Sequence, residues 1–259
     1  MNSTNQRIPN VGSTLARIYG AVSSRVGVRE RARNQLLRHR AHLHTLFPLR
    51  YSDADPFERI YVDPDDVTAI QRPYDHPRIA TDEKRRFDKY ENTGRVVCGN
   101  WDRSVDSWED LALHSGFRER FLDGVPWAET EFVRKVTSDG TEWNRRWPNS
   151  RWELCTTESE MLEMLSAYDE LFEAIRTNGY QPSPVLDEVT VNVGRDGQLI
   201  HNNSGSHRLS IAKLLDVDRI PARVLVRHHD WQRRRNELRL GRTDPNDTID
   251  HPDLSEFEW

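Results

Sequence analysis

The sequence predicts an α+β protein in which a small mixed sheet is flanked by helices. Three segments of the C-terminal half indicate this class. Residues 158–177 place apolar side chains three and four positions apart, as an amphipathic helix does. Residues 189–193 alternate as a strand, and residues 222–227 form a second run rich in valine. A helix followed by strands favours a sheet with helices packed on it.

The block between these strands has its own turn signals. Residues 195–197, Arg-Asp-Gly, predict a hairpin turn because Asp-Gly tolerates positive φ. Residues 198–201 are then the returning strand, and residues 202–205 are a loop. Ser206 is expected to cap a helix over residues 206–215, because a serine hydroxyl can accept a hydrogen bond from a first-turn amide.

The N-terminal half predicts shorter elements. Residues 59–62 are a strand candidate that the following Asp-Pro pair stops, and residues 95–98 are a second one. Residues 106–123 and 126–137 are expected to be helical, separated by Gly-Val-Pro. These segments form a helical elaboration beside the sheet.

Charge divides the chain into three parts. Residues 1–50 hold nine Arg and one acid, so this segment carries +8 while the whole chain carries −5. It is expected to be a basic helical arm that packs on the body, contacts nucleic acid or an acidic partner, or lies on a membrane. Residues 51–235 are the main domain. Residues 236–259 are expected to be a disordered acidic tail, since the last 17 residues hold six acids and no base.

Composition excludes two classes of protein. Two cysteines, Cys98 and Cys155, cannot form a disulfide framework, so a reducing, cytoplasmic location is expected. No apolar run approaches the roughly 18 residues that a membrane-spanning helix needs.

The most informative motif is Gly205-Ser206-His207-Arg208, where a predicted loop runs into a predicted helix. The first turn of a helix has free N–H groups and the positive end of the helix dipole, which together bind anions. Gly205 lets the backbone approach closely, and Asn203, Ser206 and His207 add donors. Arg208 can donate to two phosphate oxygens at once. The motif therefore predicts a phosphate-binding loop.

Several residues around this motif resemble the ParB/sulfiredoxin superfamily. They are Asp196-Gly197, the run from Gly205 to Leu209, Ala212 and Ile220-Pro221. In that superfamily a Gly-x-His-Arg or Gly-x-Arg-Arg loop opens a helix and binds phosphate. The resemblance covers residues 158–228 and, at about 58–67, a first strand with the turn that follows it. It implies a ParB/sulfiredoxin-like fold in which residues 68–157 are an insertion.

Activities differ within the superfamily, and this sequence matches the motifs of some members better than those of others. Sulfiredoxins use a cysteine where this chain has Ser206, and ParB proteins carry a helix-turn-helix that this sequence does not predict. A free-serine kinase branch binds a nucleoside triphosphate or diphosphate with Mg²⁺, and uses a carboxylate after the first strand as base. Asp63, Asp65 and Asp66 are the matching carboxylates, and the resemblance does not choose among them.

Two further residues follow predicted strands and are secondary candidates for the same cleft. Asp102 lies in the loop after residues 95–98, and His228 follows the last predicted strand, residues 222–227. The histidines have no spacing typical of a metal site, so no metal ligand is predicted.

The sequence leaves three functions open. The first is a nucleotide-dependent phosphotransferase or nucleotide hydrolase, with Asp63, Asp65, Asp66 or His207 in catalysis and a nucleotide or phosphorylated small molecule as ligand. The second is a ParB-like nucleic-acid-binding or nuclease-like protein that uses the basic arm. The third is a non-catalytic module that senses nucleotide.

Overall fold

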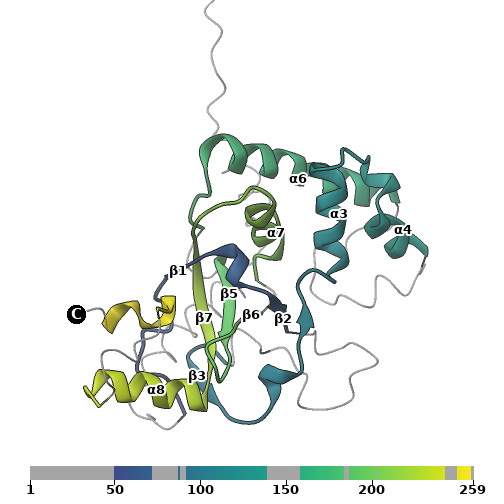
Figure 1. Cartoon of the computed structure of the whole chain (residues 1–259). Helices are drawn as coiled ribbons and strands as arrows, with labels where there is room; N and C mark the ends of the chain where they lie inside the picture. The colour runs from purple at the N-terminus through teal and green to yellow at the C-terminus, as the bar shows by residue number, and fades with distance from the viewer. Residues whose placement is uncertain are drawn as a thin grey trace, which may run out of the picture.

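The computed structural model describes residues 50–71, 87, 92–138, 158–183, 187–202, 204–242 and 250–257. The predicted basic arm of residues 1–50 lies outside these ranges, apart from Arg50. The described residues form a mixed sheet with helices around it, so the α+β class is confirmed (Figure 1).

The sheet is organised around one long strand, β7 (Ile220–His228). β5 (Val189–Val193) pairs parallel with β7 on one side. On its other side β7 pairs first with β1 (Ile60–Val62), antiparallel, and then with β3 (Arg95–Val97), parallel. Beyond β5 follow β6 (Leu199–His201), β2 (Ala69–Ile70) and β4 (Asp106–Ser107), so the strand order is β1-β7-β5-β6-β2-β4.

The strands β5 and β7 are buried along their whole length, which the sequence pattern did not indicate. Alternation in residues 189–193 is typical of a strand with one face in water. Here both faces of the two strands are covered. Polar side chains such as Thr190 of β5 and Arg223 of β7 are as buried as the valines of the same strands. Charged and hydrogen-bonding groups therefore enter the interior from the middle of the sheet.

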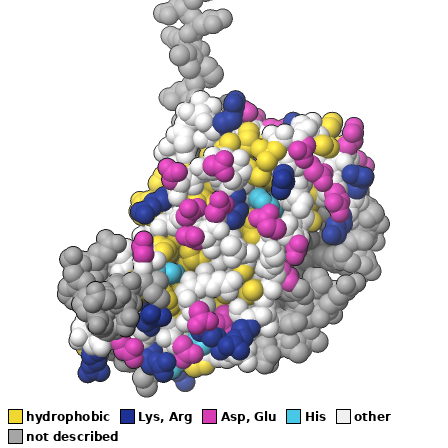
Figure 2. Space-filling model, in the orientation of Figure 1, with side chains coloured by type: hydrophobic (Ala, Val, Ile, Leu, Met, Phe, Trp, Pro, Cys, Tyr) yellow, Lys and Arg dark blue, Asp and Glu magenta, His cyan; other side chains and the backbone are white. Residues whose placement is uncertain are grey.

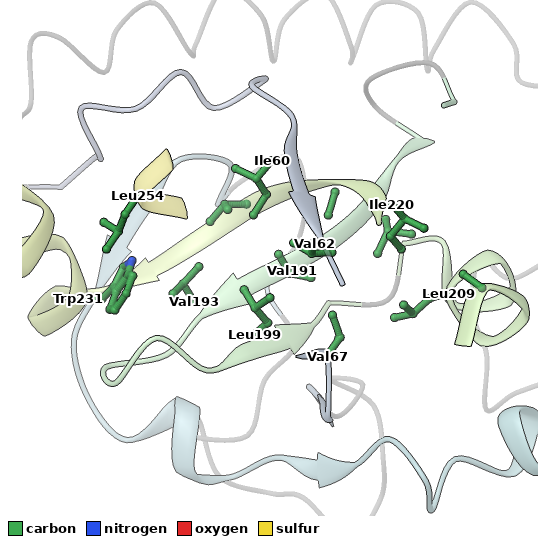
Figure 3. Packing of buried hydrophobic residues seen from close by; sticks show 14 of the residues in the cluster. Ile60, Val62, Val67, Val191, Val193, Leu199, Leu209, Ile220, Trp231 and Leu254 are labelled. Carbon is green, nitrogen blue, oxygen red and sulfur yellow. The ribbon is translucent and has the colours of Figure 1, made fainter. Parts of the chain in front are cut away.

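One face of the sheet carries the larger apolar core (Figure 3). Valines of β5 and β7 pack there against Leu209 of α7 (Ser206–Leu214), Trp231 of α8 (His229–Arg239) and Leu254. A second core lies among α3 (Ala112–Phe121), α4 (Glu131–Ser138) and α6 (Glu158–Asn178), where Phe117 is fully buried. In Figure 1 these three helices gather at one end of the molecule and α8 lies at the opposite end.

The expected helices before residue 140 are only partly correct. The first begins at Ala112, because residues 106–107 pair with β2 as β4 instead. The second is a short 3-10 turn, Trp127–Glu129, followed by α4. Thr130 separates the two with an extended backbone, and its hydroxyl oxygen accepts a hydrogen bond from the N–H of Val133.

Surface charge is mixed in sign. On the face that Figure 2 shows, Lys and Arg side chains are interspersed with Asp and Glu. Within the described ranges, no helix has the length and apolarity to cross a bilayer.

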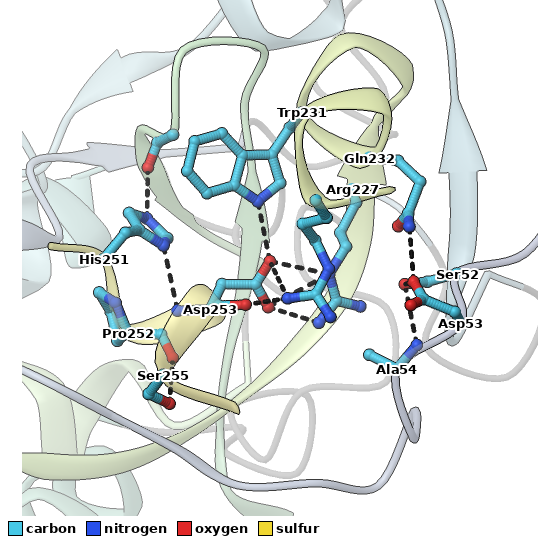
Figure 4. Close-up of polar contacts among 12 residues, drawn as sticks. Ser52, Asp53, Ala54, Arg227, Trp231, Gln232, His251, Pro252, Asp253 and Ser255 are labelled. Atoms are coloured by element: carbon cyan, nitrogen blue, oxygen red, sulfur yellow. Dashed lines mark hydrogen bonds and ion pairs between the residues drawn. The ribbon is translucent and has the colours of Figure 1, made fainter. Parts of the chain in front are cut away.

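The prediction of a disordered tail over residues 236–259 is wrong for its described part. Helix α8 continues to Arg239, and a 3-10 helix, η10 (Pro252–Phe257), packs back on the domain. The Asp253 carboxylate lies within hydrogen-bonding distance of Arg227 and of the Trp231 indole N–H, which is 2.8 Å away (Figure 4). Arg235 donates to the Asp253 carbonyl. The prediction rests on the acidic composition of this segment. Composition does not reveal that buried arginines elsewhere in the chain bind one of its acids.

We expect Asp253→Asn to destabilise the protein by about 3–5 kcal/mol, because it leaves the buried Arg227 and Arg235 without their counter-ion. Urea unfolding at pH 7 measures this, with the exposed Asp250→Asn as control. Burial alone would raise the pKa of Asp253, but Arg227 and Arg235 outweigh burial and hold the pKa below its usual value.

This lowered pKa fixes the pH dependence of the same effect. A carboxyl with a lowered folded-state pKa contributes stability above its unfolded pKa of about 3.9, and the contribution is lost as the pH falls through the folded value. The difference between wild type and Asp253→Asn should therefore shrink below about pH 4. Equal stability of the two proteins at pH 7 would contradict the role given to Asp253.

Candidate functional site

The predicted phosphate loop lies where β6 leads into α7. Gly205 occupies the N-cap position of α7 with φ of 82°, in the left-handed region. The prediction that Ser206 caps the helix is wrong, because Gly205 turns the chain one residue earlier and Ser206 is the first helical residue. The predicted helix itself is confirmed to within one residue. Asn203 lies outside the described residues.

Two backbone amides in the first turn of α7 have no acceptor among the described residues. Gly205 has no side chain that could accept a hydrogen bond from it, and the helical ladder begins with Leu209 N–H donating to the Gly205 carbonyl at 2.9 Å. The N–H groups of Ser206 and Arg208 have no acceptor among the described residues. Among the described residues, two amides without an acceptor therefore lie at the positive end of the helix dipole.

The site is also rigid, because Gly205 lies directly on β5. A Cβ atom at Gly205 would be 2.9 Å from Val189 Cγ2 and 3.0 Å from Val189 Cα. His207 stacks on Tyr168 of α6, with ring centroids 4.3 Å apart and an angle of 15° between the planes. The first turn is thus held by the sheet on one side and by α6 on the other.

Arg208 is engaged inside the protein and is not free to donate both of its ends to a ligand. Its guanidinium donates to the Ser183 hydroxyl and to the Asp187 carbonyl. One of its nitrogens lies 3.7 Å from the carboxylate of Glu188, and the residue is 7% exposed. Arg208 therefore anchors the first turn and contributes positive charge to it.

Asp63, Asp65 and Asp66 belong to a segment that contacts α7, and Asp65 contacts the last turn of that helix. They form or precede a 3-10 helix, η2 (Pro64–Asp66), in which the Asp63 carboxylate accepts a hydrogen bond from Asp65 N–H. Asp65 pairs at 3.5 Å with Lys213, in the last turn of α7. Seven residues of helix separate Ser206 from Lys213, which is about 10 Å along the axis.

The secondary candidates Asp102 and His228 also lie elsewhere and have partners. Burial alone would raise the pKa of Asp102, but hydrogen bonds from Arg195 outweigh burial and hold the pKa below its usual value. His228 caps α8 by accepting from Asp230 N–H, and its other nitrogen lies 2.9 Å from the Gly99 carbonyl. Val189, beside Gly205, pairs with Ala222 at the other end of β7. Six strand residues, about 20 Å, therefore separate Gly205 from His228.

Residues that the sequence did not single out surround Arg208. Glu188 is fully buried and accepts from Arg59 Nε at 3.0 Å, while Arg59 also donates to the Ser183 carbonyl at 2.7 Å. Burial raises the pKa of Glu188, although Arg208 and Arg59 oppose this effect. No sequence signal distinguishes Glu188 from the acid beside it, Asp187, so only the fold reveals this cluster. Among the described residues, no group of three or more His, Cys, Asp or Glu side chains is arranged to hold a metal ion.

The contact of Gly205 with Val189 predicts that Gly205→Ala is more costly than a comparable change elsewhere. Gly179 also has positive φ, 73°, but nothing lies within 4 Å of its Cβ position. Gly179→Ala should cost about 1 kcal/mol for the left-handed backbone alone. Gly205→Ala should cost roughly 1–3 kcal/mol more, because β5 must move. Urea unfolding compares the two variants, and equal losses would show that Gly205 does not touch the sheet.

Comparisons with known proteins assign no family to this chain. No protein-family model matches it, and no curated protein or solved structure matches it significantly. The resemblance of residues 205–209 to the ParB/sulfiredoxin superfamily therefore rests on the motif itself, and the function has to be inferred from the geometry around α7.

Proposed function

We propose that this protein binds a phosphate group, carried by a nucleotide or another phosphorylated small molecule, at the first turn of α7. One observation carries the proposal: the amides of Ser206 and Arg208 have no acceptor among the described residues, at a helix start that Gly205 fixes against β5. Phosphate oxygens are suitable acceptors for such amides, and the helix dipole favours their charge.

Preorganisation supports this function. Binding is weakened when a loop must be ordered, and a turn held by Val189, Tyr168 and Glu188 avoids that cost. Arg208 adds a positive charge from within the turn without leaving its internal partners. The resemblance to ParB/sulfiredoxin-like proteins supports the same class of ligand, a nucleoside triphosphate or diphosphate with Mg²⁺.

The geometry of α7 supports phosphate binding more directly than it supports a reaction of the bound phosphate. Phosphoryl transfer or nucleotide hydrolysis needs a base or a residue that orients the nucleophile beside the phosphate. Of the four residues expected to act in catalysis, only His207 belongs to the first turn of α7, since Asp65 pairs with Lys213 at its other end. His207 is therefore the residue that we assign to proton transfer, should the bound nucleotide react.

The alternative of a nucleic-acid-binding protein receives less support from the face of the molecule that Figure 2 shows. A groove for a phosphodiester backbone needs clustered Lys and Arg. On the face in Figure 2 the basic side chains are interspersed with acidic ones. The basic arm that motivated this alternative lies outside the described residues. We therefore propose a small phosphorylated ligand.

Calorimetric titration of the full chain with ATP, ADP and CTP in the presence of Mg²⁺ tests the proposal. We expect one of these nucleotides to bind wild type. Ser206→Asp should weaken that binding roughly tenfold or more, because a carboxylate then lies where the phosphate charge belongs. The same change should not unfold the protein, because an acid in the first turn of a helix is stabilising.

Ser206→Asn is the matched control, since it changes the side chain by a similar volume without adding charge. It should retain nucleotide binding within a few-fold of wild type. If no nucleotide binds wild type, or if the Asp and Asn variants bind equally well, the first turn of α7 is not the phosphate site.

A further inference from the structure

A buried arginine in the middle of the sheet has a side chain without a hydrogen-bond partner among the described residues. Arg223 lies on β7, pairs with Thr190 of β5 and is 1% exposed. Its Nε, Nη1 and Nη2 atoms are all buried without an acceptor in the part of the chain that the structure describes. A guanidinium group has five N–H donors in a fixed planar arrangement, so all of them are left unsatisfied here. Buried polar groups are otherwise almost always bonded, which makes Arg223 an exception that requires an explanation.

The neighbourhood of Arg223 has more positive than negative charge. Ile60 pairs with Ala222 in antiparallel register, so Arg59 lies beside Arg223 at the next position. Arg59 and Arg208 both contact the single buried acid of this region, Glu188. Asp187 and Glu188 are the acids that act on Arg223, and Asp187 is exposed to solvent. Three guanidinium groups thus share two carboxylates.

The excess of positive charge around Arg223 is not removed by deprotonation of the arginine, and its aromatic neighbour does not replace a hydrogen-bond acceptor. Burial lowers the pKa of Arg223 to about 10, while Asp187 and Glu188 oppose the shift, so the group stays charged at neutral pH. The ring of Phe57 lies 5.8 Å from the guanidinium carbon, and a single aromatic face offers no hydrogen-bond acceptor of oxygen type. An isolated buried charge is strongly unfavourable, whereas a bound oxyanion would supply both the missing charge and the missing acceptors.

From this geometry we infer a second anion-binding site, in which Arg223, with Arg59 beside it, holds a compact oxyanion: a phosphate or carboxylate group of a ligand. Arg223 itself is buried, but two of its neighbours are partly exposed: the side chain of Arg59 is 33% exposed, and Phe57 is half-buried. Its cations come from β7 and from the residue before β1, whereas the proposed phosphate site uses backbone amides of α7. The two sites share only the neighbourhood of Glu188 and Arg208.

Thermal unfolding of the full chain tests this inference with inorganic phosphate, sulfate and acetate as probes, against chloride at the same ionic strength. At about 100 times its dissociation constant, an oxyanion that binds the folded state should raise the Tm of wild type by about 5–10 °C. In Arg223→Met this rise should fall to the smaller general effect that these anions have on any protein. In chloride alone, Arg223→Met should melt above wild type, because the unpaired buried charge has been removed.

Two control variants make the result specific. Arg219→Met removes an exposed arginine just before β7, and should keep the full anion response. The rise in Tm that remains in Arg223→Met measures the general stabilisation by sulfate and phosphate that any protein shows. Ser206→Asp should keep the response as well, because it blocks only the first turn of α7. Loss of the phosphate response in Ser206→Asp but not in Arg223→Met would place phosphate at α7 and overturn the second site.

The inference also fails if phosphate, sulfate and acetate leave the Tm of wild type equal to that in chloride. It fails equally if Arg223→Met responds to them as wild type does. Failure of the second site would leave the nucleotide titrations of the α7 site unaffected, and a nucleotide that does not bind at α7 would leave the Arg223 result standing.

Discussion

The central strand β7 imposes the constraint on which the rest of this structure depends. It is buried along all nine residues and yet carries two arginines, Arg223 and Arg227, into the interior. A buried guanidinium needs a counter-charge and several acceptors, so the chain must bring these from other elements. The architecture around β7 shows how this requirement is met at Arg227 and how it is left open at Arg223.

At Arg227 the answer comes from the far end of the chain. The 3-10 helix η10 places Asp253 against Arg227, Trp231 and Arg235, so that strand β7, helix α8 and the C-terminal segment meet at one carboxylate. A segment with acidic composition is thereby ordered by the charges it covers. Near Arg223, the carboxylate of Glu188 contacts two other arginines, Arg59 and Arg208. It therefore does not accept a hydrogen bond from Arg223. Arg227 has a carboxylate partner and Arg223 has none among the described residues, and this difference is the reason for proposing a ligand at Arg223.

The proposed phosphate site depends on the same cluster indirectly. Arg208 belongs to the first turn of α7, and its bonds to Ser183 and Asp187 fix that turn against the segment that enters β5. Gly205 fixes it from the other side by contact with Val189. The arginine of the motif is therefore used for positioning, and in our proposal the backbone amides of Ser206 and Arg208 bind the ligand. A phosphate would be held by backbone amides whose orientation the fold has already fixed, so binding would not require ordering them.

The sequence by itself determined the elements that local chemistry decides. The hairpin at residues 195–197, the strand Val189–Val193 and the helix from Ser206 follow from turn residues and apolar periodicity, which act over a few neighbouring residues. Only the tertiary structure decided which polar side chains meet. Asp65 was adjacent to the site in the sequence argument but pairs with Lys213, and Glu188, Arg59 and Arg223 carried no signal although they share one cluster. The reason is physical: the register of strands far apart in the chain sets these contacts, and a buried charge is stable only where that register supplies its partner.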